Sequence, residues 1–157
     1  MTNPVERILP DPDATDAFGR RLATLIPEQG LAVALSGPLG AGKSSLARAL
    51  LRGLGVTGPV PSPTYTLVEP YIVHGREAYH VDLYRLGEPD ELDMLGLADI
   101  AEGAVLLVEW PERDTGHRLR FDLTLHLTHH DKGRGLRAEP HTPRGEQVAR
   151  AALGETA

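Results

Sequence analysis

The sequence has no cysteine among its 157 residues, which excludes disulfide bonds and thiolate-bound metal sites. It also lacks any apolar run close to the length of about 20 residues that crosses a bilayer. Residues 1–7 have neither the basic start nor the apolar core of a secretory signal peptide. These absences predict a cytoplasmic protein with no membrane segment.

A surplus of basic residues is absent too, since the formal net charge is −6 at pH 7. Tight binding to a nucleic-acid backbone over a broad surface needs many Lys and Arg contacts, so DNA is not an expected partner. A local basic patch is still compatible with this charge. The length suits a single domain over residues 1–157 with a proper hydrophobic core.

One glycine-rich stretch fits the pattern G-x-x-x-x-G-K-[ST], the phosphate-binding loop of nucleotide triphosphatases. Residues 31–35 precede it as a continuous apolar run, typical of a strand buried on both faces. Residues 45–54 follow it with helical periodicity. The motif requires this order of strand, loop and helix, which predicts a phosphate cradle built by Gly37, Pro38, Leu39, Gly40, Ala41, Gly42, Lys43 and Ser44.

The chemistry of this loop follows from its position at a helix N-terminus, where unpaired N–H groups and a partial positive charge attract anions. Lys43 would reach the β- and γ-phosphates, and the Ser44 hydroxyl would ligate Mg²⁺. The sequence has no Asn-Lys-x-Asp motif for reading guanine, and a D-x-x-G match at residues 93–96 falls in a helical stretch. We therefore expect ATP with Mg²⁺ rather than GTP.

Two acids are candidates for ordering Mg²⁺ or water beside the γ-phosphate. Glu109 ends a second apolar run, residues 104–108, and ligands in α/β sheets bind at the carboxyl ends of strands. Asp82 lies in a segment with the pattern of a strand, in which alternation puts His80, Asp82 and Tyr84 on one face. Asp82 could orient the attacking water or be an ordinary acid on a solvated strand.

The remaining periodicity predicts an α/β P-loop NTPase fold, with a mixed, mainly parallel sheet flanked by helices and containing an antiparallel hairpin that turns at residues 74–75. Expected strands are residues 5–9, 31–35, 64–73, 77–84, 104–108, 121–128 and 136–139. The first expected helix is capped by Thr15 and closed by Pro27. Further helices are expected at residues 43–54, 87–96 and 143–153, with a turn at 99–102. In the helix at 87–96, Leu92, Leu95 and Met94 are expected to point inward.

Three further features have competing interpretations. The loop around Thr64 could sense the γ-phosphate or be ordinary turn chemistry. Trp110, the single tryptophan, could be a core anchor, a partner contact or a wall beside the nucleotide, and the sequence alone favours the core. The late histidines lack a regular ligand spacing, which argues against a metal site at His126, His129, His130 and His141.

Four segments taken together resemble the TsaE family, also called YjeE, the ATPase of bacterial tRNA threonylcarbamoyladenosine biosynthesis. They are residues 37–44, 62–68 (Ser-Pro-Thr-Tyr-Thr-Leu-Val), 80–86 (His-Val-Asp-Leu-Tyr-Arg-Leu) and 108–112 (Val-Glu-Trp-Pro-Glu). The resemblance spans about residues 9–112 and fades in the last third. The chain departs from the family at Pro38, where an acid is common, and at Ser44, where Thr is common; Ser44 keeps the hydroxyl.

The resemblance implies an ATPase that acts on the TsaB and TsaD proteins and resets their complex between turnovers, with tRNA contacted indirectly. It implies that Lys43 binds phosphate, that Ser44 and Glu109 hold Mg²⁺, and that Asp82 supports hydrolysis. Thr64 would be a switch hydroxyl and Trp110 a neighbour of the active site. The segment around Pro12 would pass near the adenine.

Two alternatives remain open at this point. A P-loop small-molecule kinase would need an arginine-bearing lid, for which Arg113, Arg118 and Arg120 are available. A non-catalytic subunit could bind nucleotide only to hold an interface, although the intact set of Lys43, Ser44, Asp82 and Glu109 argues against that.

Overall fold

The computed structural model describes residues 5–63, 66–88, 90–97, 100 and 102–154. Its strands are β1 (Val5–Leu9), β2 (Leu31–Ser36), β3 (Val68–Val73), β4 (Arg76–Asp82), β5 (Val105–Glu109), β6 (Leu123–His130) and β7 (Gly133–Pro140). Its helices are α1 (Pro12–Thr24), α2 (Lys43–Leu54), α3 (Glu91–Met94), the 3₁₀ turn η2 (Pro111–Arg113) and α4 (Pro143–Leu153). No helix in these ranges has the length and apolar character needed to cross a membrane.

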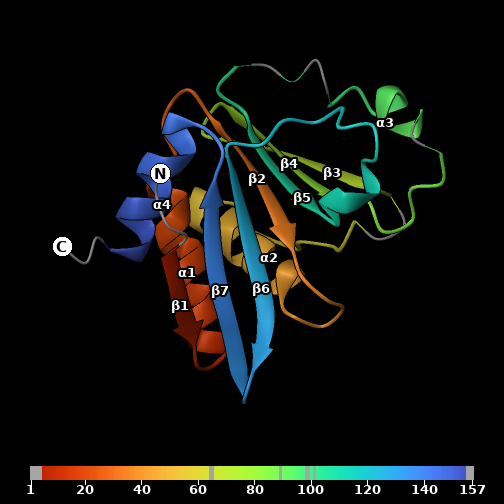
Figure 1. Cartoon of the computed structure of the whole chain (residues 1–157). Helices are drawn as coiled ribbons and strands as arrows, with labels where there is room; N and C mark the ends of the chain where they lie inside the picture. Colours follow the sequence, from red (N-terminus) through yellow and green to blue (C-terminus); the bar gives the residue numbers. More distant parts are fainter. Residues whose placement is uncertain (1–4, 64–65, 89, 98–99, 101, 155–157) are drawn as a thin grey trace.

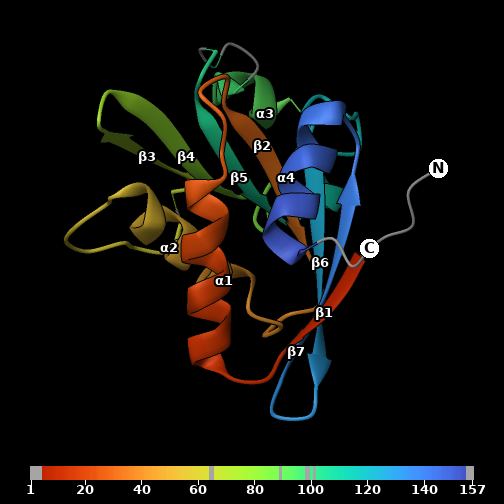
Figure 2. The same cartoon turned by 90° about the vertical axis from the view of Figure 1, so that its left-hand side faces the viewer.

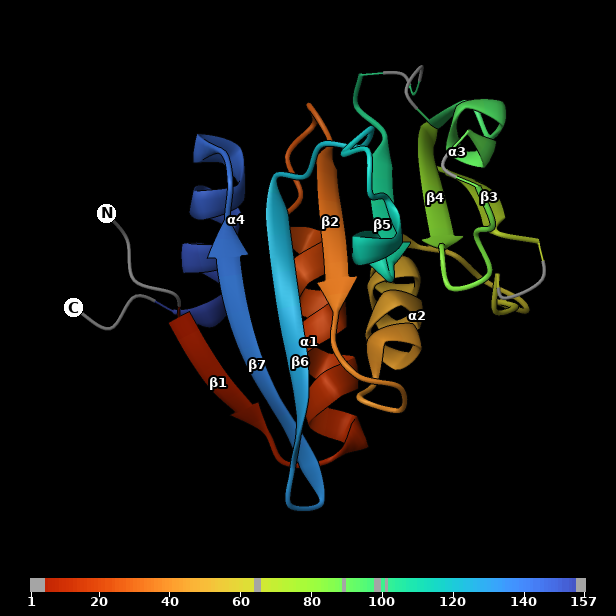
Figure 3. The same ribbon diagram turned by 45° about the vertical axis from the view of Figure 1, so that its right-hand side comes forward.

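The strands form one sheet in the order β1-β7-β6-β2-β5-β4-β3 (Figure 3). Strands β6, β2, β5 and β4 pair in parallel, whereas β7 and β3 run antiparallel to their neighbours and β1 is antiparallel to β7. Five strands therefore share one direction, and β3 and β4 form the expected hairpin. The predicted P-loop NTPase fold with a mixed, mainly parallel sheet is confirmed.

Helices α1, α2 and α4 cover one face of the sheet (Figure 2). The main core lies there, between leucines of α1 and α2 such as Leu22 and Leu50 and strand residues such as Val33 and Leu107. A smaller core on the opposite face is centred on β4 and β5 and also contacts Ala32 of β2 and Val68 of β3. Strand β5 is buried on both faces for this reason, as its continuous apolar run predicts.

The start of α1 differs from the prediction that Thr15 caps it. The N-cap is Asp11, whose carboxylate accepts a hydrogen bond from the Ala14 N–H at 2.8 Å, and Thr15 is buried one turn further on. Pro12 occupies the first turn, where a missing N–H costs nothing because that group has no helical partner. The helix ends at Thr24, before Pro27.

The middle of the chain is less regular than its pattern suggests. Strand β3 begins at Val68 because Leu67 has a left-handed backbone (φ 68°), and residues 64–65, like part of the expected turn at 99–102, lie outside the described residues. The helix expected at 87–96 is the single turn α3, and Met94 is 85% exposed rather than inward. The last helix, α4, has the predicted bounds, and the Thr142 hydroxyl caps it.

Candidate functional site

The site lies where three parallel strands end side by side. Glu109 closes β5, and the register places it beside Leu35 of β2 and Asp82 of β4. Strand β2 then runs through Ser36 into the glycine loop and helix α2 (Figure 1). The two acids and the phosphate loop predicted from the sequence are therefore brought together at one edge of the sheet, as expected for α/β folds.

The glycine loop delivers the N-terminus of α2 without any acidic or side-chain cap. Gly42 is the N-cap with φ 104°, Gly40 has φ 79°, and no acidic residue lies in the first turn of α2. Only glycine adopts such angles at little cost, and they turn successive backbone N–H groups toward a common point. The loop is thus built to receive an anion at the positive end of the helix dipole.

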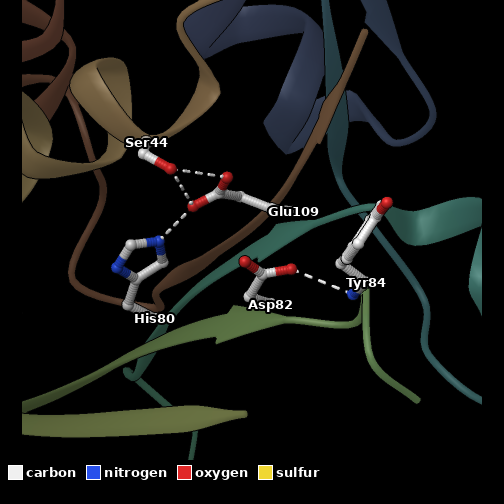
Figure 4. A network of polar contacts seen from close by, with 5 residues as sticks. All are labelled: Ser44, His80, Asp82, Tyr84 and Glu109. Carbon is white, nitrogen blue, oxygen red and sulfur yellow. Dashed lines mark hydrogen bonds and ion pairs between the residues drawn. The ribbon is translucent and has the colours of Figure 1, made fainter. Parts of the chain in front are cut away.

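A buried chain of polar contacts joins Ser44, Glu109 and His80 (Figure 4). The Ser44 hydroxyl donates to the Glu109 carboxylate, with Oγ at 2.9 Å from Oε1 and 3.2 Å from Oε2. His80 Nε2 lies 2.6 Å from Glu109 Oε2, and both residues are 2% exposed. Because a carboxylate accepts, Nε2 carries the hydrogen, and His80 Nδ1 is buried with no hydrogen-bond partner among the described residues.

His80 shares a strand face with Asp82, as alternation predicts, but its contact with Glu109 was not expected from the sequence. Alternation along β4 was the available signal, since it turns both side chains toward α2 together with Glu109 from the neighbouring strand.

Asp82 is buried at the end of β4 with one of its oxygens already occupied. The Tyr84 backbone N–H donates to Oδ1 at 2.9 Å (Figure 4). Burial raises the pKa of Asp82 above its usual range, and the nearby Glu109 charge acts in the same direction. No ion pair within the described ranges neutralises Asp82.

Lys43 folds back over its own loop and against Trp110. Its ammonium donates to the Gly37 carbonyl and lies 3.2 Å from the centroid of the indole ring, which is a cation–π contact. Burial lowers the pKa of Lys43, while the Glu109 charge opposes that shift. Trp110 has a left-handed backbone (φ 59°), an uncommon conformation for a bulky residue, at the point where β5 turns into η2.

The Trp110 ring packs against Tyr84 with centroids 4.9 Å apart, and Trp110 also packs partly against the smaller core. The sequence-based preference for a core anchor therefore describes only one of its two roles, because the same side chain is also a wall of the site.

These groups line a cavity of about 360 Å³, within the size range of small-ligand sites. Eight of the predicted site residues line it: Leu39, Gly40, Gly42, Lys43, Ser44, Asp82, Glu109 and Trp110. Pro12 is not part of it but lines an adjoining cavity of about 250 Å³ with Ser45, and Arg134 lines both. Thr64 lies outside the described residues.

The arginines considered for a kinase lid are mostly elsewhere. Arg118 forms ion pairs with Asp90 at 3.1 Å and Asp93 at 3.2 Å, and with Arg120 it lines a different cavity near the amino end of β2. Arg113 alone approaches the site, with its guanidinium carbon 5.3 Å from the Tyr84 ring centroid.

The late histidines are not arranged as metal ligands. His126 hydrogen-bonds Glu139 at 2.9 Å, which lowers the pKa of that carboxyl, and His141 hydrogen-bonds Thr124 at 2.7 Å. In the part of the chain that the structure describes, no three metal-binding side chains of the His, Cys, Asp and Glu types come together.

Comparison with known proteins agrees with this geometry. The sequence model of the family "Threonylcarbamoyl adenosine biosynthesis protein TsaE" matches residues 9–137. A TsaE protein of Haemophilus influenzae is 36% identical over 148 residues, covering 91% of this chain and 94% of the relative. One from Synechocystis is 44% identical over 116 residues, covering 71% and 73%.

Among solved structures, Bacillus subtilis YdiB superposes with a TM-score of 0.74 at 25% identity, covering 97% of this chain and 95% of that one. The match to the family sequence model extends through β6 and most of β7, beyond residue 112, where the motif resemblance ends. This chain belongs to the TsaE family, whose curated members are named for tRNA threonylcarbamoyladenosine biosynthesis.

Proposed function

We propose that this protein is the ATP-binding and ATP-hydrolysing subunit of tRNA threonylcarbamoyladenosine biosynthesis. The observation that carries the proposal is the hydrogen bond between the Ser44 hydroxyl and the Glu109 carboxylate at the uncapped N-terminus of α2. It joins a phosphate-binding loop to an acid at the end of a buried strand, 65 residues apart in sequence. The names of the relatives supply the pathway.

Phosphate binding is assigned to the loop N–H groups and Lys43. The ammonium lies within the cavity on the Gly37 carbonyl and the Trp110 ring, so a triphosphate would draw it from these neutral contacts to charged oxygens. Charge-assisted hydrogen bonds contribute about 1.5–3 kcal/mol, more than the neutral bond that is lost. Trp110 would then remain as the wall of the pocket.

Mg²⁺ fits the donor set of Ser44 and Glu109, since both offer oxygen atoms and the ion prefers a hydroxyl or carboxylate together with phosphate oxygens and water. When bound, the ion would neutralise charge between the β- and γ-phosphates. Glu109 is held from behind by His80, so its carboxylate is fixed in orientation before any ligand arrives.

Hydrolysis is assigned to Asp82 as the group that contacts the attacking water. The Tyr84 N–H fixes Oδ1, which leaves Oδ2 to accept a hydrogen bond from water. Its raised pKa makes the carboxylate a better proton acceptor than an exposed aspartate. Neither Asp82 nor Glu109 is ion-paired with an arginine within the described ranges.

The lone protein would turn over slowly, because the sequence has no recognisable arginine finger for the γ-phosphate, and TsaB and TsaD would accelerate it. An arginine placed on the transferred phosphoryl group is worth about 10³–10⁵ in rate, and a partner protein can supply it. The hydrolysis step would reset the TsaB–TsaD complex between turnovers, and tRNA would be contacted through those partners. The protein would work as a single cytoplasmic domain over residues 1–157.

The test is phosphate release from ATP by the full-length protein, alone and with purified TsaB, TsaD and tRNA. We expect slow release alone, stimulation by the partners, and loss of both in Glu109→Gln, which keeps the size of the side chain but removes its charge. Fast turnover by the lone chain would contradict the partner requirement. A phosphorylated small-molecule acceptor in place of free phosphate would indicate the kinase alternative.

A further inference from the structure

The β6–β7 hairpin reaches past the end of β2 and stands beside the phosphate loop (Figures 1 and 3). Strand β6 pairs with β2 only as far as His126, opposite Ser36, so residues 127–130 extend beyond it. In this extension His129 and Arg134 are directly opposite each other across the hairpin. Alternation puts both on the face that Leu127 and Leu136 present to the helices.

Both residues lie against glycines of the loop. The Arg134 guanidinium occupies the space next to the Gly42 Cα, where a side chain at position 42 would collide with it. His129 Cε1 is 3.8 Å from the place where a Cβ on Gly40 would stand. The absence of a side chain at Gly42 therefore leaves room for the guanidinium, whereas His129 lies at ordinary van der Waals distance from Gly40.

Arg134 lies without an ion-pair partner among the residues that the structure describes. Within the described ranges no carboxylate forms an ion pair with it, and its one side-chain hydrogen bond, to Thr15 Oγ1, is long at 3.3 Å. Guanidinium groups stay charged at all relevant pH values and match phosphate oxygens in geometry. A half-buried, unpaired arginine beside an uncapped helix N-terminus is suited to an anion.

We infer that the β6–β7 hairpin is a second wall of the nucleotide site, in which Arg134 binds the phosphate chain opposite Lys43 and His129 closes the wall over Gly40. Arg134 lines both the cavity with Lys43 and Glu109 and the adjoining cavity with Ser45 and Pro12. It therefore contacts the end of the phosphate chain nearest the nucleoside. This inference rests on the proposed nucleotide-binding function and adds residues to it.

The test compares Arg134→Gln with Arg137→Gln. Arg137 is on the same strand, opposite His126, and alternation puts it on the other face of the sheet. It lines a separate groove that Gly37 and Pro38 border but that includes neither Lys43 nor Glu109, so the control removes the same charge from the same hairpin. Affinities for ADP and for inorganic triphosphate are measured by calorimetry on the full-length protein. We expect Arg134→Gln to weaken both about 10- to 100-fold, as the loss of a charge-assisted contact predicts, and Arg137→Gln to leave both nearly unchanged.

Further variants separate contact with phosphate from a structural role. Arg134→Lys keeps the charge but not the planar fork and should recover part of the affinity. Thr15→Val removes the one side-chain hydrogen bond that the guanidinium makes within the described residues, and this variant should bind normally. Equal losses in Thr15→Val and Arg134→Gln would overturn the inference. Thermal unfolding of each variant checks that its fold is retained.

The ligands themselves distinguish the remaining outcomes. Unchanged binding in Arg134→Gln, or weakened ADP with unchanged triphosphate, would overturn the assignment to phosphate. A wild-type protein that binds neither ligand would overturn the proposed function itself, before any variant is considered.

Discussion

Removing the His80 donor should weaken the response of this protein to Mg²⁺ without removing its affinity for nucleotide. His80 Nε2 lies 2.6 Å from Glu109 Oε2, and neither side chain is more than 3% exposed. The change His80→Asn leaves that oxygen without its donor, because the Asn amide corresponds in reach to Nδ1 rather than Nε2. The carboxylate would keep only Ser44 and would be free to turn away from it.

The magnitude follows from the type of hydrogen bond. A bond to a charged group contributes about 1.5–3 kcal/mol, which corresponds to roughly 10- to 150-fold in an equilibrium constant. Loss of an outer partner of a metal-ligating side chain typically costs about 10–100-fold in metal affinity or activity. We therefore expect His80→Asn to lose about 10- to 100-fold in Mg²⁺-dependent nucleotide affinity and phosphate release.

The assay is ADP affinity in Mg²⁺ and in EDTA, with phosphate release as the second measurement. His80→Gln is the matched control, since its amide nitrogen can occupy the place of Nε2, and it should recover much of the loss. Equal losses of ADP affinity in Mg²⁺ and in EDTA would mean that His80 merely supports the fold. Wild-type behaviour of His80→Asn would refute the positioning role outright.

Three further outcomes are expected. Lys43→Met should weaken ATP binding about 10- to 100-fold in calorimetry, since one charge-assisted phosphate contact is lost, and unchanged affinity would contradict the role of the ammonium. Burial raises the pKa of Asp82 above 3.8, so its ionised form destabilises the fold increasingly as pH rises through that range. Asp82→Asn should therefore unfold at a higher temperature than wild type at pH 7, and a stabilisation of about 1 kcal/mol would raise the midpoint by about 2–4 °C. This advantage should disappear below about pH 4, where the wild-type aspartate is protonated in both states. The same variant should fail to hydrolyse ATP. Leu50→Ala should cost about 2–5 kcal/mol of unfolding free energy because Leu50 is fully buried, whereas Leu39→Ala, at a position 75% exposed, should leave denaturation unchanged.

The parts of the fold that could be predicted are those whose signal is local. Residues 31–35 and 104–108 are continuous apolar runs because β2 and β5 are buried on both faces, and the glycine motif follows directly in the chain. Glu109 could be found for the same reason, as an acid at the end of such a run. Strand alternation made Asp82 a second candidate, and the family resemblance favoured its role in hydrolysis and a place for Trp110 beside the active site.

Contacts that depend on the order of the strands in the sheet could not be predicted from local sequence patterns. His80 meets Glu109 only because β4 pairs with β5 in a register that sets Asp82 beside Glu109. Arg134 reaches Gly42 only because β6 lies next to β2 and extends beyond it, a matter of sheet order and strand length that hydrophobic periodicity does not encode.

The prediction that Thr15 caps α1 was wrong for a local reason. The fixed φ of Pro12 suits the first turn of a helix, so α1 begins before Thr15. The residue ahead of it, Asp11, then takes the cap that the pattern assigned to Thr15.

The contact between Lys43 and Trp110 also makes the chain its own optical probe. The sequence has one tryptophan, so all indole emission comes from a ring whose centroid is 3.2 Å from the ammonium group. Indole emission depends on nearby charge and on water, and a ligand that draws the ammonium away changes both. Phosphate binding can therefore be followed in the unlabelled protein, from a single residue and with no background from any other tryptophan.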